Sequence, residues 1–281
     1  MSITAYCKKI NFLDCPNKLH SKALGELNFF TEKGLLQNGK SYIQKYDDYF
    51  IFHKKNFGTF KIYKDAIHYD LAKNFTKNVK LSICLNQPMA CNAYLNGFLV
   101  MHCSAFYYKN FAYLLLGQSG SGKSTLLFHI LKYAKFITED IGIFDRENIY
   151  PSFPITKITD EHINSNFIES ESKISFDERG RYSCKIKEKY FKKRSAPVGG
   201  IFILNRCKKE NVTALSLSEK ISAIYSSSLR LIEDVDHKYE ENFLKKASIL
   251  AKINAFRINI PSNEDASSSA KKLIKFLDEN F

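Results

Sequence analysis

A glycine-rich stretch in the middle of the chain, residues 117–125 (GQSGSGKST), has the residue types and spacing of a phosphate-binding loop. It matches the pattern G-x-x-x-x-G-K-[ST] at every fixed position. Glycines let backbone N–H groups turn inward around a phosphate, and the N-terminus of the following helix adds a partial positive charge. The stretch therefore predicts binding of a nucleoside triphosphate through Gly117, Ser119, Gly120, Ser121, Gly122, Lys123, Ser124 and Thr125.

Two side chains of this loop have distinct expected tasks. Lys123 is expected to reach the β- and γ-phosphates and the Ser124 hydroxyl to bind Mg²⁺, so ATP with Mg²⁺ is the expected ligand pair. The flanking segments fit this interpretation: residues 111–116 (FAYLLL) are typical of a buried strand and residues 126–131 (LLFHIL) of a helix. A glycine turn that binds nothing would not need Lys-Ser-Thr after its last glycine.

An acid pair, Glu139 and Asp140, ends the next apolar run, residues 135–140. If strand, loop helix and strand form a β-α-β unit, the two strands are parallel and their carboxyl ends share one edge of the sheet. This predicts that both carboxylates lie beside the phosphate loop. Acids within an apolar run are costly unless they are paired or bind a metal. A turn with solvated carboxylates is the alternative.

A histidine ahead of the loop is the third candidate. Residues 98–108 are expected to form one long strand that turns at 109–110 into the strand before the loop. A two-residue turn pairs Tyr108 with Phe111 and places His102 opposite Gly117. A slip in this register still leaves His102 near the phosphates, and a buried histidine with satisfied hydrogen bonds is the alternative.

Composition limits the class of protein. The chain has 281 residues, of which 44% are hydrophobic, and a net charge of +13. We interpret this charge chiefly as Lys-rich composition, so a nucleic-acid partner is not expected. Seven cysteines without a C-x-x-C pair favour reduced thiols in a cytoplasmic protein. Residues 1–9 lack an export signal and no apolar run is long enough to span a membrane, while a homo-oligomer is left open.

Two regions are expected along the chain. Residues 1–85 form a small β-rich N-terminal region, and residues 86–281 form the domain that carries the phosphate loop. Residues 145–180 are expected to be mainly loop, with 165–180 a candidate lid. The remaining expected elements are strands at 41–46, 49–53, 59–63, 199–204 and 255–261 and helices at 88–96, 218–231, 238–253 and 266–280.

The densest basic run is residues 185–194 (KIKEKYFKKR). Such a run is usually a solvated face, and its alternative role is to bind an acidic substrate or the nucleotide phosphates. A role in binding an acidic acceptor predicts a KM that depends on salt, since salt screens exposed charges.

Four segments together resemble the HPr kinase/phosphorylase family. They are residues 101–105 (MHCSA), the loop 117–125, residues 136–140 (FITED) and residues 197–204 (PVGGIFIL). The resemblance covers roughly residues 86–260 and is closer to shorter relatives, some of which are peptide-modifying kinases encoded with lasso-peptide clusters. It implies an α/β fold: a P-loop core with a mixed sheet like that of phosphoenolpyruvate carboxykinase, here with the β-rich N-terminal region added.

The resemblance also implies roles for individual residues. Asp140 matches the general base that lies next to the metal, His102 the assisting histidine, and Lys123 and Ser124 the residues that hold phosphate and Mg²⁺. With Glu139, the implied metal residues are Ser124, Glu139 and Asp140. The implied activity is ATP-dependent transfer of the γ-phosphate to a Ser or Thr hydroxyl of a peptide or small protein, with an acidic acceptor suiting the basic run.

Two departures and three alternatives complete the interpretation. The acid pair is Glu-Asp where HPr kinase has Asp-Asp, and the long glycine-containing signature of that family has no match. Both weigh against HPr as acceptor and against the reverse phosphorolysis. The alternatives are a small-molecule hydroxyl kinase on the same fold, a non-catalytic nucleotide-binding module, and an ABC-type ATPase, whose Leu-Ser-Gly-Gly-Gln signature the sequence lacks.

Overall fold

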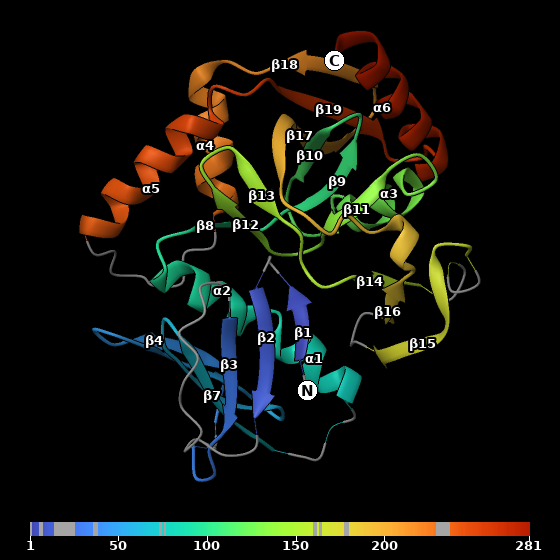
Figure 1. Cartoon of the computed structure of the whole chain (residues 1–281). Helices are drawn as coiled ribbons and strands as arrows, with labels where there is room; N and C mark the ends of the chain where they lie inside the picture. The colour runs from blue at the N-terminus through green and yellow to red at the C-terminus, as the bar shows by residue number, and fades with distance from the viewer. Residues whose placement is uncertain are drawn as a thin grey trace.

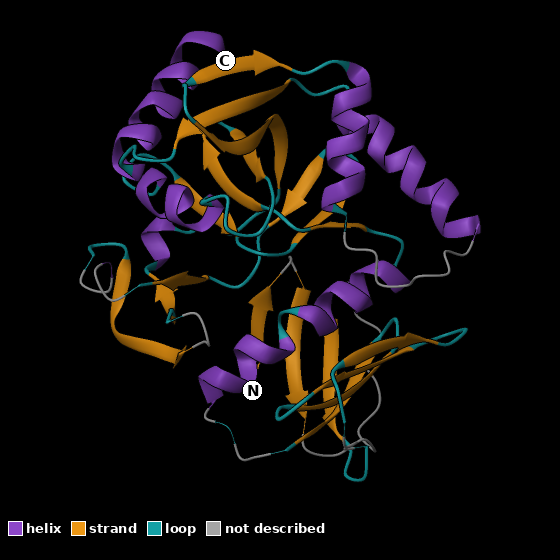
Figure 2. Cartoon of the chain, turned by 180° about the vertical axis from the view of Figure 1, so that it is seen from behind, coloured by secondary structure: helices purple, strands orange, loops and turns teal. Residues whose placement is uncertain are grey.

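The computed structural model describes residues 2–5, 8–13, 26–35, 39–72, 75, 77–159, 162, 165–176, 180–228 and 237–281. Within these residues the chain is a mixed α/β protein with three sheets, as Figures 1 and 2 show from opposite sides. The mixed α/β class expected from the sequence is therefore confirmed. The end of the helix expected at 218–231 lies outside the described residues, as does part of the candidate lid at 165–180.

The N-terminal sheet has seven strands in the order β1-β2-β3-β7-β6-β5-β4, and it is mixed. β3 is parallel to both β2 and β7, and the other pairs are antiparallel. The three strands expected from alternating residues correspond to β4, β5 and β6, whereas the others were not expected. The strands are β1 (Ser2–Ala5), β2 (Lys8–Leu13), β3 (Glu26–Thr31), β4 (Tyr42–Lys45), β5 (Phe50–Lys54), β6 (Gly58–Ile62) and β7 (Ala66–Leu71).

Two short helices connect this sheet to the rest of the chain. α1 (Lys77–Cys84) lies in the region expected to be β-rich, and α2 (Gln87–Leu95) is the helix expected at 88–96. α2 is buried on nearly all sides, including Met89, Ala90 and Cys91. The hydrophobic core around α2 also contains Val100 and Ile143, which belong to the larger sheet. Hydrophobic packing is therefore continuous between residues 1–85 and the rest of the chain.

The larger sheet has nine strands, seven of them in the order β11-β9-β10-β17-β13-β12-β8. Of the other two, β19 pairs with β17, and β18 pairs with β19. β17 is parallel to β10 on one side and to β19 on the other. The strand expected at 98–108 is split, because β8 pairs with β12 while β9 pairs with β10 and β11. The strands are β8 (Leu99–Met101), β9 (Ser104–Tyr108), β10 (Phe111–Leu116), β11 (Lys135–Thr138), β12 (Gly142–Asp145), β13 (Asn148–Tyr150), β17 (Ala196–Cys207), β18 (Asn211–Ala214) and β19 (Ala255–Pro261).

Helices cover both faces of this sheet. Successive residues of a strand point to opposite faces, and β10 shows this directly. Tyr113 and Leu115 pack in the core formed with α3 (Lys123–Ile130) and α6 (Ala266–Asn280). Leu114 and Leu116 pack instead in the core formed with α4 (Leu217–Ser227) and α5 (His237–Leu250). β10 is thus buried on both faces, which fixes the position of the phosphate loop that follows it.

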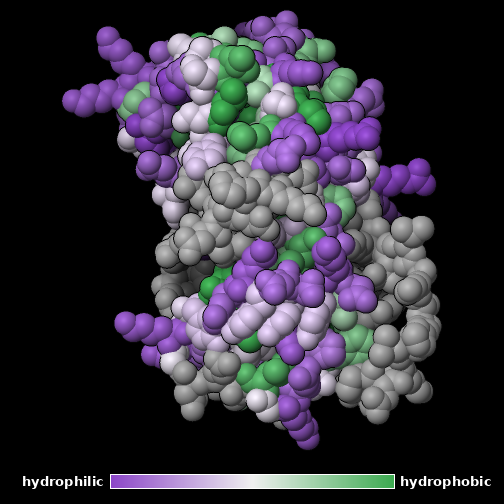
Figure 3. Space-filling view, turned by 90° about the vertical axis from the view of Figure 1, so that its left-hand side faces the viewer, coloured by the Kyte–Doolittle hydropathy of each residue, from purple (hydrophilic) through white to green (hydrophobic). Residues whose placement is uncertain are grey.

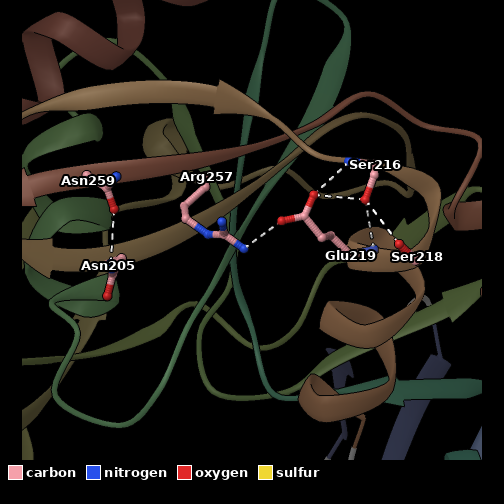
Figure 4. A network of polar contacts seen from close by, with 6 residues as sticks. All are labelled: Asn205, Ser216, Ser218, Glu219, Arg257 and Asn259. Carbon is pink, nitrogen blue, oxygen red and sulfur yellow. Dashed lines mark hydrogen bonds and ion pairs between the residues drawn. The ribbon is translucent and has the colours of Figure 1, made fainter.

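A polar network fixes the start of α4 (Figure 4). The Ser216 hydroxyl accepts from the Glu219 backbone N–H at 3.4 Å, and the Glu219 carboxylate accepts from the Ser216 N–H at 2.9 Å, which is a capping box. The second oxygen of Glu219 pairs with Arg257 of β19 at 3.1 Å. The cap therefore anchors α4 to the sheet.

The third sheet corrects the expectation that residues 145–180 are mainly loop. β14 (Ile155–Ile158), β15 (Ile168–Phe176) and β16 (Tyr182–Ile186) form an antiparallel sheet in the order β14-β16-β15. A short 3₁₀ helix, η2 (Glu188–Tyr190), follows β16 within the basic run. β15 is rich in polar residues and pairs with β16 along its length. The candidate lid is therefore largely a strand.

Figure 3 views the molecule from the side on which α4 and α5 lie in Figure 1, with green hydrophobic side chains among purple ones in its upper part. Leu217, Ile221 and Tyr225 are exposed at four-residue spacing along α4, and Leu244 is exposed on α5.

Among the described helices, none is both long and apolar enough to cross a membrane.

Candidate nucleotide-binding site

The phosphate loop begins where β10 ends and closes into the first turn of α3. Gly117 has φ 142°, and a Cβ atom there would lie 2.8 Å from the Leu204 carbonyl oxygen and 2.8 Å from Ser121 Oγ. Gly122, with φ 94°, is the N-cap residue of α3. Because glycine has no side chain to cap the helix, the first N–H groups of α3 can bind an anion. Ser119, Gly120 and Thr125 are exposed on the rim of the loop.

Lys123 is buried beneath this loop, with 7% of its surface exposed. Its Nζ donates to the carbonyl oxygens of Gly117 at 2.7 Å and Gln118 at 3.0 Å. Burial lowers the pKa of Lys123, and the charge of Asp140 partly opposes this effect. The ammonium group is therefore held at the centre of the glycine loop, where a phosphate would be bound.

The acid pair lies at the same edge of the sheet as the loop. β10 and β11 are parallel to each other, but both pair antiparallel with β9, which lies between them. The chain leaves β11 at Thr138 and turns sharply at Asp140, whose φ is 69°. The expected placement of the carboxylates beside the loop agrees with the structure, since the charges of both acids act on Lys123.

Glu139 points inward. Its Oε2 accepts from the Thr156 hydroxyl at 2.6 Å and from the Lys157 backbone N–H at 3.1 Å. Its Oε1 is buried and has no hydrogen-bond partner among the described residues. Burial and the neighbouring charge of Asp140 raise the pKa of Glu139, while the Ser124 hydroxyl and the other donors lower it less. An unpartnered carboxylate oxygen near Ser124 fits a bound cation.

These oxygens suit Mg²⁺ in particular. Within the described part of the chain, no three His, Cys, Asp or Glu side chains are grouped to hold a metal by themselves. Mg²⁺ does not need such a cage, because it is usually held by one or two carboxylates, phosphate oxygens and water. Ser124 and Glu139 would hold it here. The buried Ser121 hydroxyl inside the loop has no hydrogen-bond partner in the described part of the chain, and it could make a further polar contact.

Asp140 is placed differently from its neighbour. Its carboxylate forms an ion pair with the Lys157 ammonium, and about a quarter of its side chain is exposed (27%). Burial by itself would raise the pKa of Asp140, but the charge and hydrogen bond of Lys157 outweigh burial and hold the pKa below its ordinary value. The charges of His102 and Arg181 act in the same direction. Asp140 is thus held as a carboxylate, and it lines a hollow together with Glu139 and Lys157.

His102 reaches this site by a different route from the expected one. The β9–β10 ladder has the expected register, with Tyr108 opposite Phe111, but it ends at the Ser104–Leu115 pair. His102 lies beyond that end, in the break between β8 and β9. Its Nδ1 lies 2.9 Å from the backbone carbonyl oxygen of Asp140. Since a carbonyl oxygen only accepts, Nδ1 carries a proton, and His102 supports the turn that presents Asp140.

Three residues of the site were not expected from the sequence. Thr156 and Lys157 lie on β14, inside a segment expected to be loop, although its β-branched residues Ile155, Thr156 and Ile158 were a usable strand signal. Arg206, near the end of β17, places its guanidinium 2.6 Å from where a Cβ on Gly122 would lie. No local pattern distinguishes Lys157 or Arg206 from the other cations of this Lys-rich chain.

We expect Lys157→Met to raise the pKa of the Asp140 carboxyl group. Asp140 keeps its burial in this variant but loses the cation that now outweighs burial, so its midpoint must move to higher pH. Carboxyl ¹³C NMR titration of the ligand-free protein measures this midpoint. Lys157→Arg keeps the charge and should leave the midpoint close to that of the parent. An unchanged midpoint in Lys157→Met would show that the ion pair does not control Asp140.

Comparisons with known proteins give a distant structural similarity. No family model matches the chain, and no curated protein matches it. Among solved structures, it is similar to the HPr(Ser) kinase/phosphatase from Coxiella burnetii, with 11% sequence identity and a TM-score of 0.31. The match covers 64% of this chain and 95% of that chain.

Proposed function

We propose that this protein is an ATP-dependent kinase that transfers the γ-phosphate to a Ser or Thr hydroxyl of a peptide or small protein. Its P-loop core would resemble that of HPr kinase. One observation supports the proposal above the others. The base of the phosphate loop, a carboxylate with an unpartnered oxygen, and a second carboxylate facing a hollow all meet at one edge of the nine-stranded sheet. A module that only binds nucleotide needs the first two features but not the third.

Each residue has a task that follows from its surroundings. Bound Mg-ATP would supply the phosphoryl group and a cation that neutralises its charge. Lys123 and the N-terminus of α3 would bind the β- and γ-phosphates, and Ser124 and Glu139 would hold the cation. Asp140, which already faces the hollow as a carboxylate, would accept the proton of the acceptor hydroxyl. His102 would keep the Asp140 turn in place through its bond to the main chain.

The direct test measures transfer and binding separately. The full chain is incubated with γ-labelled ATP, Mg²⁺ and a Ser-containing peptide library, and label is followed in peptide and in inorganic phosphate. Nucleotide binding is measured in parallel by calorimetry. Label in peptide supports the proposal. Binding with no transfer to any hydroxyl would favour the nucleotide-binding module, and transfer only to small polyols would favour the small-molecule kinase.

We further expect Glu139→Gln to weaken Mg²⁺ binding at the site more than nucleotide binding. The variant removes the charge of a carboxylate whose buried Oε1 has no hydrogen-bond partner among the described residues, so half-saturation should need at least on the order of 10-fold more Mg²⁺. Mg²⁺ titration of ATP binding measures this change. Asp145→Asn, at the end of β12, is the matched control and should leave the titration unchanged. If both variants titrate like the parent, Glu139 does not hold the cation.

A further inference from the structure

Three hollows adjoin one another between the acid pair and the basic run. The first, here the acid-pair hollow, is lined by Glu139, Asp140 and Lys157 and by side chains from α1, the α1–α2 turn and residues 152–155. The second, the middle hollow, shares Ser152 and Phe153 with the first. The third, the basic hollow, shares Glu188, Phe191 and Lys193 with the second. The shared wall residues place the three hollows next to one another, and together they are called the groove here.

The basic hollow has a volume of about 660 Å³ and a strongly cationic lining. Its charged residues are Lys135, Lys189, Lys192, Lys193 and Arg194 with the single carboxylate of Glu188. Glu188 is already paired with Lys193, so it does not neutralise the remaining four cations. The lining is held against the large sheet, because the Lys192 N–H donates to the Phe136 carbonyl oxygen at 2.9 Å. This end of the groove is therefore a cationic surface whose backbone is anchored to the nine-stranded sheet.

The middle hollow, of about 420 Å³, has a different character. Its walls include Pro151, Phe153, Pro154, Ile186 and Phe191. Its charges are balanced internally, since Lys185 pairs with Glu169 at 2.9 Å and Lys193 pairs with Glu188. This part of the groove suits an apolar side chain.

We propose that the acceptor is an extended acidic peptide segment that lies along this groove. Its serine or threonine hydroxyl enters the acid-pair hollow, an apolar side chain occupies the middle hollow, and aspartate or glutamate side chains bind in the basic hollow. The proposal rests on the kinase function proposed above and adds the chemical class of the acceptor. Charge complementarity at the basic end identifies the occupant.

A peptide fits these walls better than a polynucleotide. A nucleic-acid strand carries a phosphate at every residue, but the middle hollow offers apolar walls, and its cations Lys185 and Lys193 are already paired with carboxylates. A peptide can confine its carboxylates to the basic hollow. The groove therefore selects a chain whose charge lies several residues away from its hydroxyl.

The test uses fluorescent peptides with one serine, one leucine and a terminal acidic cluster at increasing distance from the serine, beside a matched series with Gln and Asn. Anisotropy without nucleotide measures affinity, and phosphorylation measures KM and kcat. The variant is Lys189→Glu with Arg194→Glu, two exposed cations at the basic end that lie outside the catalytic residues. Lys252→Glu with Lys271→Glu makes the same charge change at exposed positions outside the three hollows.

We expect acidic peptides to bind the parent more tightly than neutral ones, with an optimum at one spacing. The basic-hollow variant should weaken acidic-peptide binding and raise KM by about tenfold, in a salt-dependent way, with little change in kcat or in neutral-peptide affinity. The control variant should behave like the parent. Equal loss in both variants, no preference for acidic peptides, or tighter binding of a single-stranded oligonucleotide of matched charge would overturn the proposal.

Failure of this inference is distinguishable from failure of the kinase function. If neutral peptides are phosphorylated as well as acidic ones, the kinase function stands and the groove assignment falls. If acidic peptides bind at the basic hollow but no peptide is phosphorylated, the groove is a peptide site and the kinase function falls.

Discussion

Asp140→Asn is expected to leave Mg-ATP bound while transfer to a peptide hydroxyl falls by a factor on the order of 10² or more. The amide has the size of the carboxylate but cannot accept the hydroxyl proton. Asn is also compatible with the backbone conformation at this position. Asp140 has φ 69°, a left-handed conformation that Asn tolerates better than Ala does. The loss therefore reports on the removed proton acceptor rather than on a distorted turn.

Single-turnover transfer to a Ser peptide and calorimetry of Mg-ATP binding together measure this effect. Hydrolysis, in which water is the acceptor, is followed in the same reactions. Glu139→Gln provides the comparison within the acid pair and should reduce transfer less at saturating Mg²⁺. Near-parental transfer by Asp140→Asn would remove Asp140 as the base, and the nucleotide-binding module would then be the better interpretation.

Lys123→Ala is expected to abolish tight binding of Mg-ATP with the fold intact. Lys123 is the buried cation at the centre of the loop, and its Nζ already bonds two loop carbonyl oxygens, so it is placed to bind phosphate without rearrangement of the backbone. Burial lowers its pKa, which shows that water screens this charge little. Its removal leaves the phosphates without the cation at the centre of the loop.

Calorimetry measures the affinity, and thermal unfolding with and without nucleotide gives a second readout. In the parent, Mg-ATP at about 100 times its Kd should stabilise the fold by about 2.7 kcal/mol, and Lys123→Ala should lose this stabilisation. Lys123→Met keeps the apolar stem and separates charge from packing. Lys132→Ala, at an exposed position just after α3, is the control. Parental affinity in both Lys123 variants would show that the loop does not bind the nucleotide as proposed.

Where pattern and structure agree, the information is local. The phosphate loop needs glycines at positions with positive φ, and Gly117, Gly120 and Gly122 have them. The last strand and helix were expected at 255–261 and 266–280, and β19 and α6 have those bounds. The side-chain periodicity of these elements and the N-cap residue Asp265 of α6 are local features of the sequence. Residues close in sequence therefore suffice to predict the bounds of both elements.

Where they disagree, the deciding partner is distant in sequence. The apolar run 98–108 is one strand by composition, but β8 and β9 pair with different strands and the chain breaks at His102. β15 lies in a polar segment that was expected to be part of a lid, and its hydrogen bonds to β16 place it in a sheet. Hydrophobicity predicts that a segment is buried, but it does not identify the strand beside it.

The sequence by itself determined that a loop with the phosphate-binding pattern lies between a buried strand and a helix, and that an acid pair ends the next strand. Only the tertiary structure decided what those acids contact. Lys157 reaches Asp140 across 17 positions of the chain, and His102 bonds its carbonyl across 38. Such contacts depend on strand order and register, which no single segment encodes. The physical reason is that a side chain acquires its charge state and its task from neighbours that the folded sheet brings together.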